Sequence, residues 1–380
     1  MGERVCVCVC VCVCVCVCVC VCARVCERER ETGVRETCIL FDIFFALKLL
    51  KGLRSGLDNH NAFAQQEDPP AGGRRVLVTG ASGLLGRAVL KEFQKRGCAV
   101  TGTAYRRAGP CLLRCDLTDE DAVKTLMSQC KPHVVVHCAA ERRPDVVERH
   151  PEAAENINVH ATAILAREAA CCGAFLLYMS SDYVFDGRRP PYGQDDAPSP
   201  VNAYGRSKME GERQTLRYCT RSAVLRVPVL FGEVESVSES AVTALWPKVL
   251  RGATAGETCA LDHCQQRFPT HTQDVAAVCW NICRDDSIRG IFHYSAKEQM
   301  TKYEMALAMA RAFNLPSDHL IPLTEQPAGV AAARPLNPRL DCSRLEVLGL
   351  GVEPRAFASA VCDCLWPFTP DKRWRQTVFH

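Results

Sequence analysis

The feature that most constrains the fold is a short apolar run, a glycine-rich turn and an amphipathic stretch, which follow one another across residues 76–96. This order of strand, turn and helix directs the free N–H groups of a helix N-terminus at a pyrophosphate. Gly80 permits the tight turn, Gly83 lets the backbone approach phosphate, and Gly86 allows close packing of helix on strand. The segment predicts a dinucleotide site, with an ordinary glycine-rich turn as the alternative.

The rhythm of strand and helix continues along the chain. Apolar runs at residues 99–105, 134–137 and 174–180 are of buried-strand type, and the pattern becomes less regular after residue 228. Such alternation predicts an α/β fold, a doubly wound parallel sheet of the Rossmann type. We expect residues 74–364 to form this domain, with a smaller C-terminal substrate lobe drawn mainly from the part after residue 228.

The end of the second predicted strand favours NADP(H) over NAD(H). Tyr105 is followed by Arg106 and Arg107, where an NAD site usually carries Asp or Glu. Two guanidinium groups match a 2′-phosphate, although paired arginines in a solvated loop are the alternative. Asp116 ends the next strand, where it is expected beside the adenine or as no more than a helix cap. Arg142 is expected to contact the cofactor or a ligand, with a plain surface arginine as the alternative.

Tyr204 and Lys208 stand four residues apart on a predicted helix and therefore share a face. An ammonium group there would favour tyrosinate and lower the pKa of the phenol from about 10. Ser181, at the end of the preceding strand, could hold a carbonyl or alcohol while Tyr204 passes a proton. The three residues are the apparatus for hydride chemistry on a C–OH/C=O pair.

Residues 180–187, together with these motifs, resemble the extended short-chain dehydrogenases/reductases of the dTDP-4-dehydrorhamnose reductase branch. Further segments narrow the resemblance to the family of regulatory β subunits of methionine adenosyltransferase II, over residues 74–380. Those segments are residues 74–89, 138–148, 265–271, 299–306 and 365–380.

The resemblance implies a non-catalytic, cytoplasmic regulatory subunit that binds NADP(H) and partners the catalytic α subunit of methionine adenosyltransferase II. It would modulate that subunit's activity in S-adenosylmethionine synthesis and its affinity for methionine. The alternative is an NADPH-dependent reductase of a dTDP-4-dehydrorhamnose-type keto sugar, with Ser181, Tyr204 and Lys208 as catalytic residues. The implied cofactor contacts are Ser82, Gly83, Leu84, Leu85, Tyr105, Arg106, Arg107, Asp116, Leu117, Cys138, Arg142, Tyr204, Lys208 and Leu230. Many extended reductases have Asn at the position of Cys138. The cysteine of this chain lacks the amide's polar contact near the cofactor, but its presence does not exclude turnover.

The end of the chain, residues 365–380, is predicted to be a partner-binding tail. It carries Trp and Arg, which are enriched in binding hot spots, and interspersed charges that argue against burial in its own core. A tail of about ten residues extends up to roughly 35 Å, far enough to enter a partner's cleft; a strap docked on this subunit is the alternative. The candidate contacts are Trp366, Phe368, Arg373, Trp374, Arg375, Gln376, Thr377, Val378, Phe379 and His380.

The beginning of the chain, residues 1–73, is interpreted as a low-complexity extension and linker. Its strict Val-Cys alternation is what a GT dinucleotide repeat encodes, so residues 1–36 are interpreted as a translated microsatellite, with a thiol-rich metal-binding tail as the alternative. The formal net charge of +3 favours no nucleic-acid partner, and no polybasic run suggests a membrane surface. The cysteines after Cys38 show no metal-like spacing, which suits reduced thiols.

Overall fold

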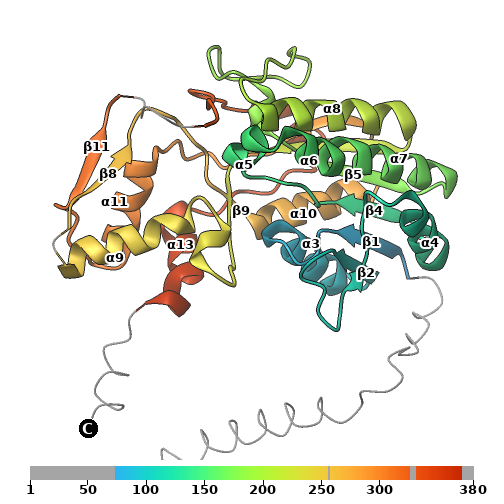
Figure 1. Ribbon diagram of the computed structural model, residues 1–380, viewed down its shortest axis with the longest axis horizontal. Helices are drawn as coiled ribbons and strands as arrows, with labels where there is room; N and C mark the ends of the chain where they lie inside the picture. The colour runs from blue at the N-terminus through green and yellow to red at the C-terminus, as the bar shows by residue number, and fades with distance from the viewer. Residues whose placement is uncertain (1–72, 256, 326–330, 370–380) are drawn as a thin grey trace, which may run out of the picture. The chain divides into compact units, whose positions relative to one another are not determined.

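A seven-stranded parallel sheet lies at the centre of the computed structural model, which describes residues 73–255, 257–325 and 331–369 (Figure 1). The strand order is β10-β6-β5-β4-β1-β2-β3. The strands are β1 (Arg75–Thr79), β2 (Ala99–Ala104), β3 (Leu113–Arg114), β4 (Val134–His137), β5 (Phe175–Ser181), β6 (Ser222–Val227) and β10 (Gly290–His293). The order reverses between β1 and β4, and ligand crevices of doubly wound sheets open at the carboxyl ends of such strands.

Helices cover both faces of this sheet because its strands are apolar on both faces. In β1, Val76 and Val78 pack with α3 (Leu84–Lys95) and α10 (Thr272–Cys283). Leu77 points the other way and packs with the helices of the opposite layer. Those helices are α4 (Glu120–Cys130), α7 (Ala161–Cys171) and α8 (Ala203–Tyr218), and α7 is preceded by α5 (Pro144–Arg149), α6 (Pro151–Glu155) and the π-helical turn Asn156–His160 (Figure 1).

A second cluster of buried side chains forms a smaller lobe after Val229. Figure 1 shows its elements gathered beyond one side of the main sheet. They are α9 (Trp246–Ala255), β8 (Cys259–Asp262), α11 (Lys302–Ala312), β11 (Leu320–Leu323) and α13 (Phe357–Leu365), with β8 and β11 paired in parallel. Two short strands, β7 (Leu230–Phe231) and β9 (Thr270–His271), pair between the lobe and the sheet. After β9, the chain returns to the main sheet with α10 and β10.

The doubly wound parallel fold predicted from the sequence is confirmed. The strands predicted at residues 99–105, 134–137 and 174–180 differ from the structure by at most one residue at either end, whereas the strand predicted to end at Asp116 ends at Arg114. Helix α3 begins at Leu84, so the glycine-rich turn already contains the first turn of the helix. The predicted extension, residues 1–73, lies outside the described residues apart from Gly73, and so do residues 370–380 of the tail. Among the helices that are described, none is long and apolar enough to span a lipid bilayer.

Candidate functional site

The turn between β1 and α3 leaves no room for a side chain at two of its glycines. Gly80 has a φ of +65°, and a Cβ there would lie 2.8 Å from the backbone N and Cα of Ala139. A Cβ on Gly86 would lie 2.2 Å from the carbonyl oxygen of Gly80. The N-terminus of α3 is therefore held close to the ends of β1 and β4. This is the cradle that the phosphates of a dinucleotide require.

A cavity of about 940 Å³ opens over this turn. It brings together every residue predicted for cofactor binding or hydride chemistry, although these residues come from distant parts of the chain. They are Gly80, Ser82, Gly83, Leu84, Leu85, Gly86, Tyr105, Arg106, Arg107, Asp116, Leu117, Cys138, Arg142, Ser181, Tyr204, Lys208 and Leu230. Within the described residues, no group of three or more His, Cys, Asp or Glu side chains could hold a metal ion.

Asp116 lies at the end of the cavity expected to hold the adenine. Its Oδ1 accepts hydrogen bonds from the N–H and the hydroxyl of Thr118, at 3.0 and 2.7 Å. The cap of α4 is Asp119, which accepts hydrogen bonds from two N–H groups of the first turn. Asp116 is thus not the helix cap, and its contacts fix the loop that lines this end of the cavity.

The two arginines after β2 have different surroundings. Arg106 lines the cavity and is exposed. Arg107 donates to the carbonyl oxygen of Ser82 at 2.7 Å and forms ion pairs with Glu235 and Glu239, at 2.9 and 2.8 Å. The guanidinium expected to hold a 2′-phosphate therefore has carboxylates of the chain itself as partners.

Ser181 and Tyr204 meet at the other end of the cavity. Asn202 accepts a hydrogen bond from Gly205 N–H at 2.8 Å and starts α8, which places Tyr204 in its first turn. Tyr204 and Ser181 both line the cavity here, and Ser181 lies close enough to lower the pKa of the Tyr204 phenol. Ser181 also donates to Asp182 at 2.9 Å, and burial raises the pKa of that carboxyl to about 7. A hydroxyl pair of this kind can hold and protonate a carbonyl oxygen.

The expected lowering of the Tyr204 pKa by Lys208 is wrong. Burial raises the pKa of Tyr204, and the neighbouring Ser181 only opposes that effect. Lys208 is itself buried, which lowers its pKa to about 7, and its Nζ lies 4.2 Å from the centre of the Tyr178 ring. Desolvation outweighs the charge attraction that the four-residue spacing suggested.

A buried ion pair beneath this site was missed by the sequence analysis. Glu212, on α8, accepts from the Arg226 Nε and Nη2 at 2.8 and 2.6 Å, and also from the hydroxyl of Ser180. The pair fastens α8 to β5 and β6. The available signal was spacing: Glu212 is four residues beyond Lys208 and eight beyond Tyr204, on the same helix face.

The part of the cavity next to the smaller lobe is cationic, a feature that the sequence analysis also missed. Arg267, Lys302 and Arg334 line it from the smaller lobe and the loops beside it. Arg334 is paired with Asp145 at 2.5 Å, and Arg267 donates to backbone carbonyls and to Gln265. Burial lowers the pKa of Lys302, and the neighbouring Arg334 and Arg267 lower it further.

The tail predicted to bind a partner is described only as far as Thr369. Helix α13 passes into the short helix Trp366–Phe368. The Trp366 side chain is 72% exposed, whereas Phe368 packs against the core of the smaller lobe. The carbonyl oxygen of Phe368 accepts a hydrogen bond from the Trp246 indole at 3.1 Å. Of the two aromatic residues, only Trp366 presents its ring to solvent. The other predicted contacts, residues 373–380, lie outside the described residues.

Known proteins resemble this chain over nearly all of the described part. The model of the RmlD substrate binding domain family matches residues 74–369. Methionine adenosyltransferase 2 subunit beta of Danio rerio is 65% identical, over 81% of this chain and 95% of the relative. The protein of that name from Xenopus laevis is 55% identical, over 83% and 94%.

A solved structure supports the fold. It is a dTDP-4-dehydrorhamnose reductase from Bacillus anthracis in complex with NADP. Its TM-score is 0.69 at 24% identity, and the match covers 78% of this chain and 99% of that one. Both the family model and the identities reach across the main sheet and the smaller lobe. The chain therefore belongs to the RmlD substrate binding domain family and, within it, to the family of methionine adenosyltransferase 2 beta subunits.

Proposed function

We propose that this chain is a regulatory subunit that binds NADP(H) in the cavity and the catalytic α subunit of methionine adenosyltransferase II through its C-terminal tail. It would modulate the activity and methionine affinity of that subunit. The observation that carries the proposal is the 65% identity to the Danio rerio beta subunit over 95% of that protein. The family model, which matches residues 74–369, covers both the cavity and the start of the tail.

The cavity supports the cofactor part of the proposal. The cradle at Gly80 and Gly86 suits a pyrophosphate, and Arg106 and Arg107 suit a 2′-phosphate. Tyr204 and Lys208 lie at the opposite end, where the nicotinamide ribose would be held. When bound, NADP(H) could also stabilise the fold by mass action, since a ligand that binds only the folded state shifts the unfolding equilibrium.

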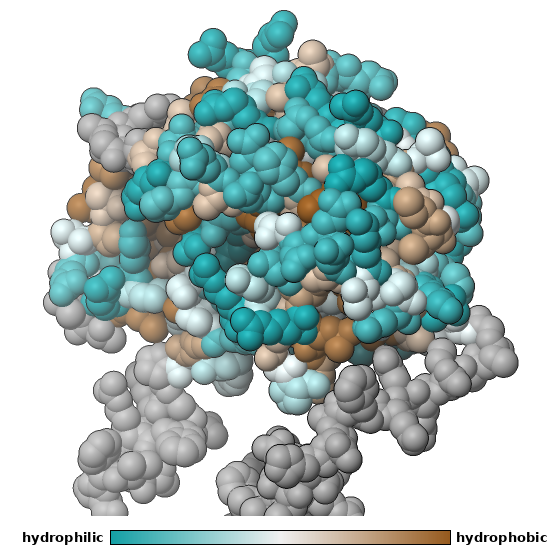
Figure 2. Space-filling model, turned by 45° about the vertical axis from the view of Figure 1, so that its right-hand side comes forward, coloured by the Kyte–Doolittle hydropathy of each residue, from teal (hydrophilic) through white to brown (hydrophobic). Residues whose placement is uncertain are grey.

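The surface supports the tail as the partner contact. On the described part of the face in Figure 2, hydrophilic residues predominate and hydrophobic ones lie in small, separate groups. Broad apolar patches are the usual mark of large permanent interfaces, so this face offers no site that competes with the tail. Trp366, exposed at the start of the tail, is the residue type that most often anchors such contacts.

Removing residues 374–380 is expected to abolish association with the α subunit while leaving NADPH binding intact, because none of the described tail residues, up to Thr369, lines the cavity. Co-purification of tagged α subunit with the full-length and the shortened chain, each with and without NADPH, measures the first effect. Titration calorimetry with NADPH measures the second. Unchanged co-purification of the shortened chain would reject the tail as the contact.

A second candidate function, reduction of a nucleotide-linked keto sugar, is favoured by the placement of Ser181, Tyr204 and Lys208 in one cavity. NADPH would supply the hydride, Ser181 would hold the substrate carbonyl, and Tyr204 would donate the proton to its oxygen. The cationic end at Arg267 and Lys302 would suit the phosphates of the sugar nucleotide.

The Tyr204→Phe variant tests this second function. It removes the only proton that Tyr204 can give, so NADPH oxidation with a dTDP-4-keto sugar should fall by at least about a hundredfold. NADPH binding should persist, which calorimetry would verify. If the wild-type chain oxidises no NADPH with any of a panel of such sugars, the reductase function is rejected and the regulatory one stands alone.

A further inference from the structure

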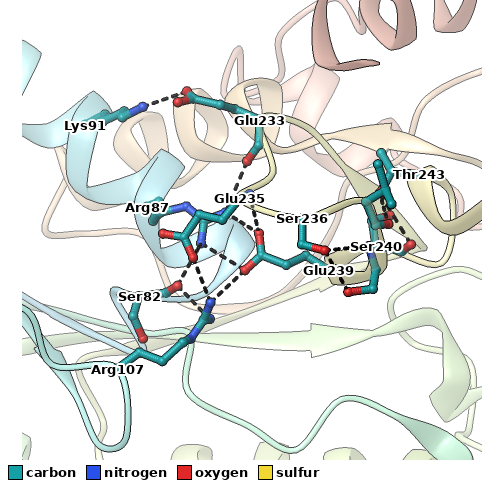
Figure 3. A network of polar contacts seen from close by, with 12 residues as sticks. Ser82, Arg87, Lys91, Arg107, Glu233, Glu235, Ser236, Glu239, Ser240 and Thr243 are labelled. Atoms are coloured by element: carbon teal, nitrogen blue, oxygen red, sulfur yellow. Dashed lines mark hydrogen bonds and ion pairs between the residues drawn. The ribbon is translucent and has the colours of Figure 1, made fainter. Parts of the chain in front are cut away.

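A short acidic segment lies beside the adenosine end of the cavity. It spans residues 233–239 and carries Glu233, Glu235 and Glu239. Its neighbours on either side, Leu230 and Ala241, line the cavity. Figure 3 shows the three carboxylates facing Lys91, Arg87 and Arg107, which come from α3 and from the end of β2. We call residues 233–239 the acidic segment.

Glu239 is the centre of these contacts. Its side chain is only 12% exposed and accepts from Arg87 Nη2 at 2.6 Å and from Arg107 Nη1 at 2.8 Å (Figure 3). Its backbone is fixed as well, because Arg142 donates to its carbonyl oxygen. Burial opposes ionisation, but the hydrogen bonds from Arg87 and Arg107 lower the pKa of Glu239 to about 2. The carboxylate is therefore charged at neutral pH.

The acidic segment is attached to the glycine turn itself. Arg87 and Arg107 both donate to the carbonyl oxygen of Ser82, at 2.8 and 2.7 Å. The two guanidinium charges beside the turn are thus balanced by two carboxylates, Glu239 and the 61% exposed Glu235. A phosphate arriving at Arg107 meets a cation that is already paired, and charge-assisted pairing to phosphate must replace pairing to carboxylate.

We propose that Glu239 is an internal counter-anion that a 2′-phosphate must displace from Arg107, so that the acidic segment weakens the binding of NADP(H) relative to NAD(H). The inference rests on the proposed binding of NADP(H). Displacement from Arg107 removes one of the two cations that hold the Glu239 side chain, while its Oε2 still faces Arg87 and the N–H of Glu235, at 2.6 and 3.0 Å. Occupancy of the cofactor site therefore changes how tightly the acidic segment is held against the glycine turn.

The Glu239→Gln variant tests this inference. Loss of the competing charge should tighten the Kd for NADPH by roughly threefold to tenfold and the Kd for NADH by less, as calorimetry would measure. The matched control is Glu233→Gln in the same segment, since the Glu233 carboxylate pairs with Lys91 at 2.6 Å and not with Arg107. That control should leave both Kd values unchanged.

Three outcomes separate the inference from the function beneath it. If wild-type chain binds neither dinucleotide, both fail. If it binds NADPH and Glu239→Gln leaves the ratio of the two Kd values unchanged or shifts it towards NADH, only the counter-anion inference is overturned. Hydrogen exchange of the wild-type chain gives a measurement without any substitution. Exchange at the amide of Glu235 should be faster with NADPH than with NADH, and slower exchange would also overturn the inference.

Discussion

Replacing Arg226 with leucine is expected to lower the free energy of unfolding by about 3–5 kcal/mol. Its side chain is 1% exposed and that of its partner Glu212 is 4% exposed, so the pair lies fully inside the protein. Loss of the guanidinium leaves the carboxylate buried without a counter-ion, which is far more costly than the pair itself is stabilising. Equilibrium unfolding in urea, followed by far-ultraviolet circular dichroism, measures the effect.

Two further variants make this expectation specific. Arg213→Leu removes an exposed ion pair with Glu210 on the same helix and should change the free energy of unfolding by less than about 1 kcal/mol. The double variant Glu212→Leu, Arg226→Leu should recover much of the loss, because neither member of the pair is left buried without the other. If Arg226→Leu is no less stable than Arg213→Leu, the buried pair does not support α8 in the way described.

The fold was predictable because its signals are local. The apolar run, the glycine turn and the amphipathic stretch within residues 76–96 are consecutive in the chain, and together they predict a strand, a turn and a helix in that order. The glycine turn, Ser181 and Tyr204 were expected at one site by the same logic, since parallel strands bring their carboxyl ends to one edge, and all of them line the cavity. Leu117 and Leu230 also line it, but they were implied only by the family resemblance.

The partners of charged residues could not be predicted, because they depend on distances across the fold. Glu239 lies 132 residues from Arg107, and nothing in either segment indicates that they meet. The pKa of Tyr204 was mispredicted for a related reason. The spacing to Lys208 is visible in the sequence, but the depth of burial is not, and burial decides the direction of the shift.

Replacing Phe357 with alanine is expected to lower the free energy of unfolding by about 3–5 kcal/mol. Phe357 begins α13, is 1% exposed, and packs against Phe231 with ring centroids 5.2 Å apart. The side chain fills the core of the smaller lobe, and alanine would leave a cavity that the surrounding helices cannot close. Urea unfolding followed by tryptophan fluorescence suits this lobe, because Trp246 lies in the same buried cluster.

Trp366 is the matched control, an aromatic residue just beyond the end of the same helix. With 72% of its side chain exposed, Trp366→Ala should change stability by less than about 0.5 kcal/mol. If the tail is the partner contact, Trp366→Ala should weaken association with the α subunit at unchanged stability. Phe357→Ala should weaken association only because the lobe that carries the tail is less stably folded. A Phe357→Ala variant as stable as Trp366→Ala would contradict the placement of α13 in the lobe's core. A loss of stability in Phe357→Ala and a loss of association alone in Trp366→Ala would show that Phe357 supports the base of the tail and that Trp366 contacts the partner.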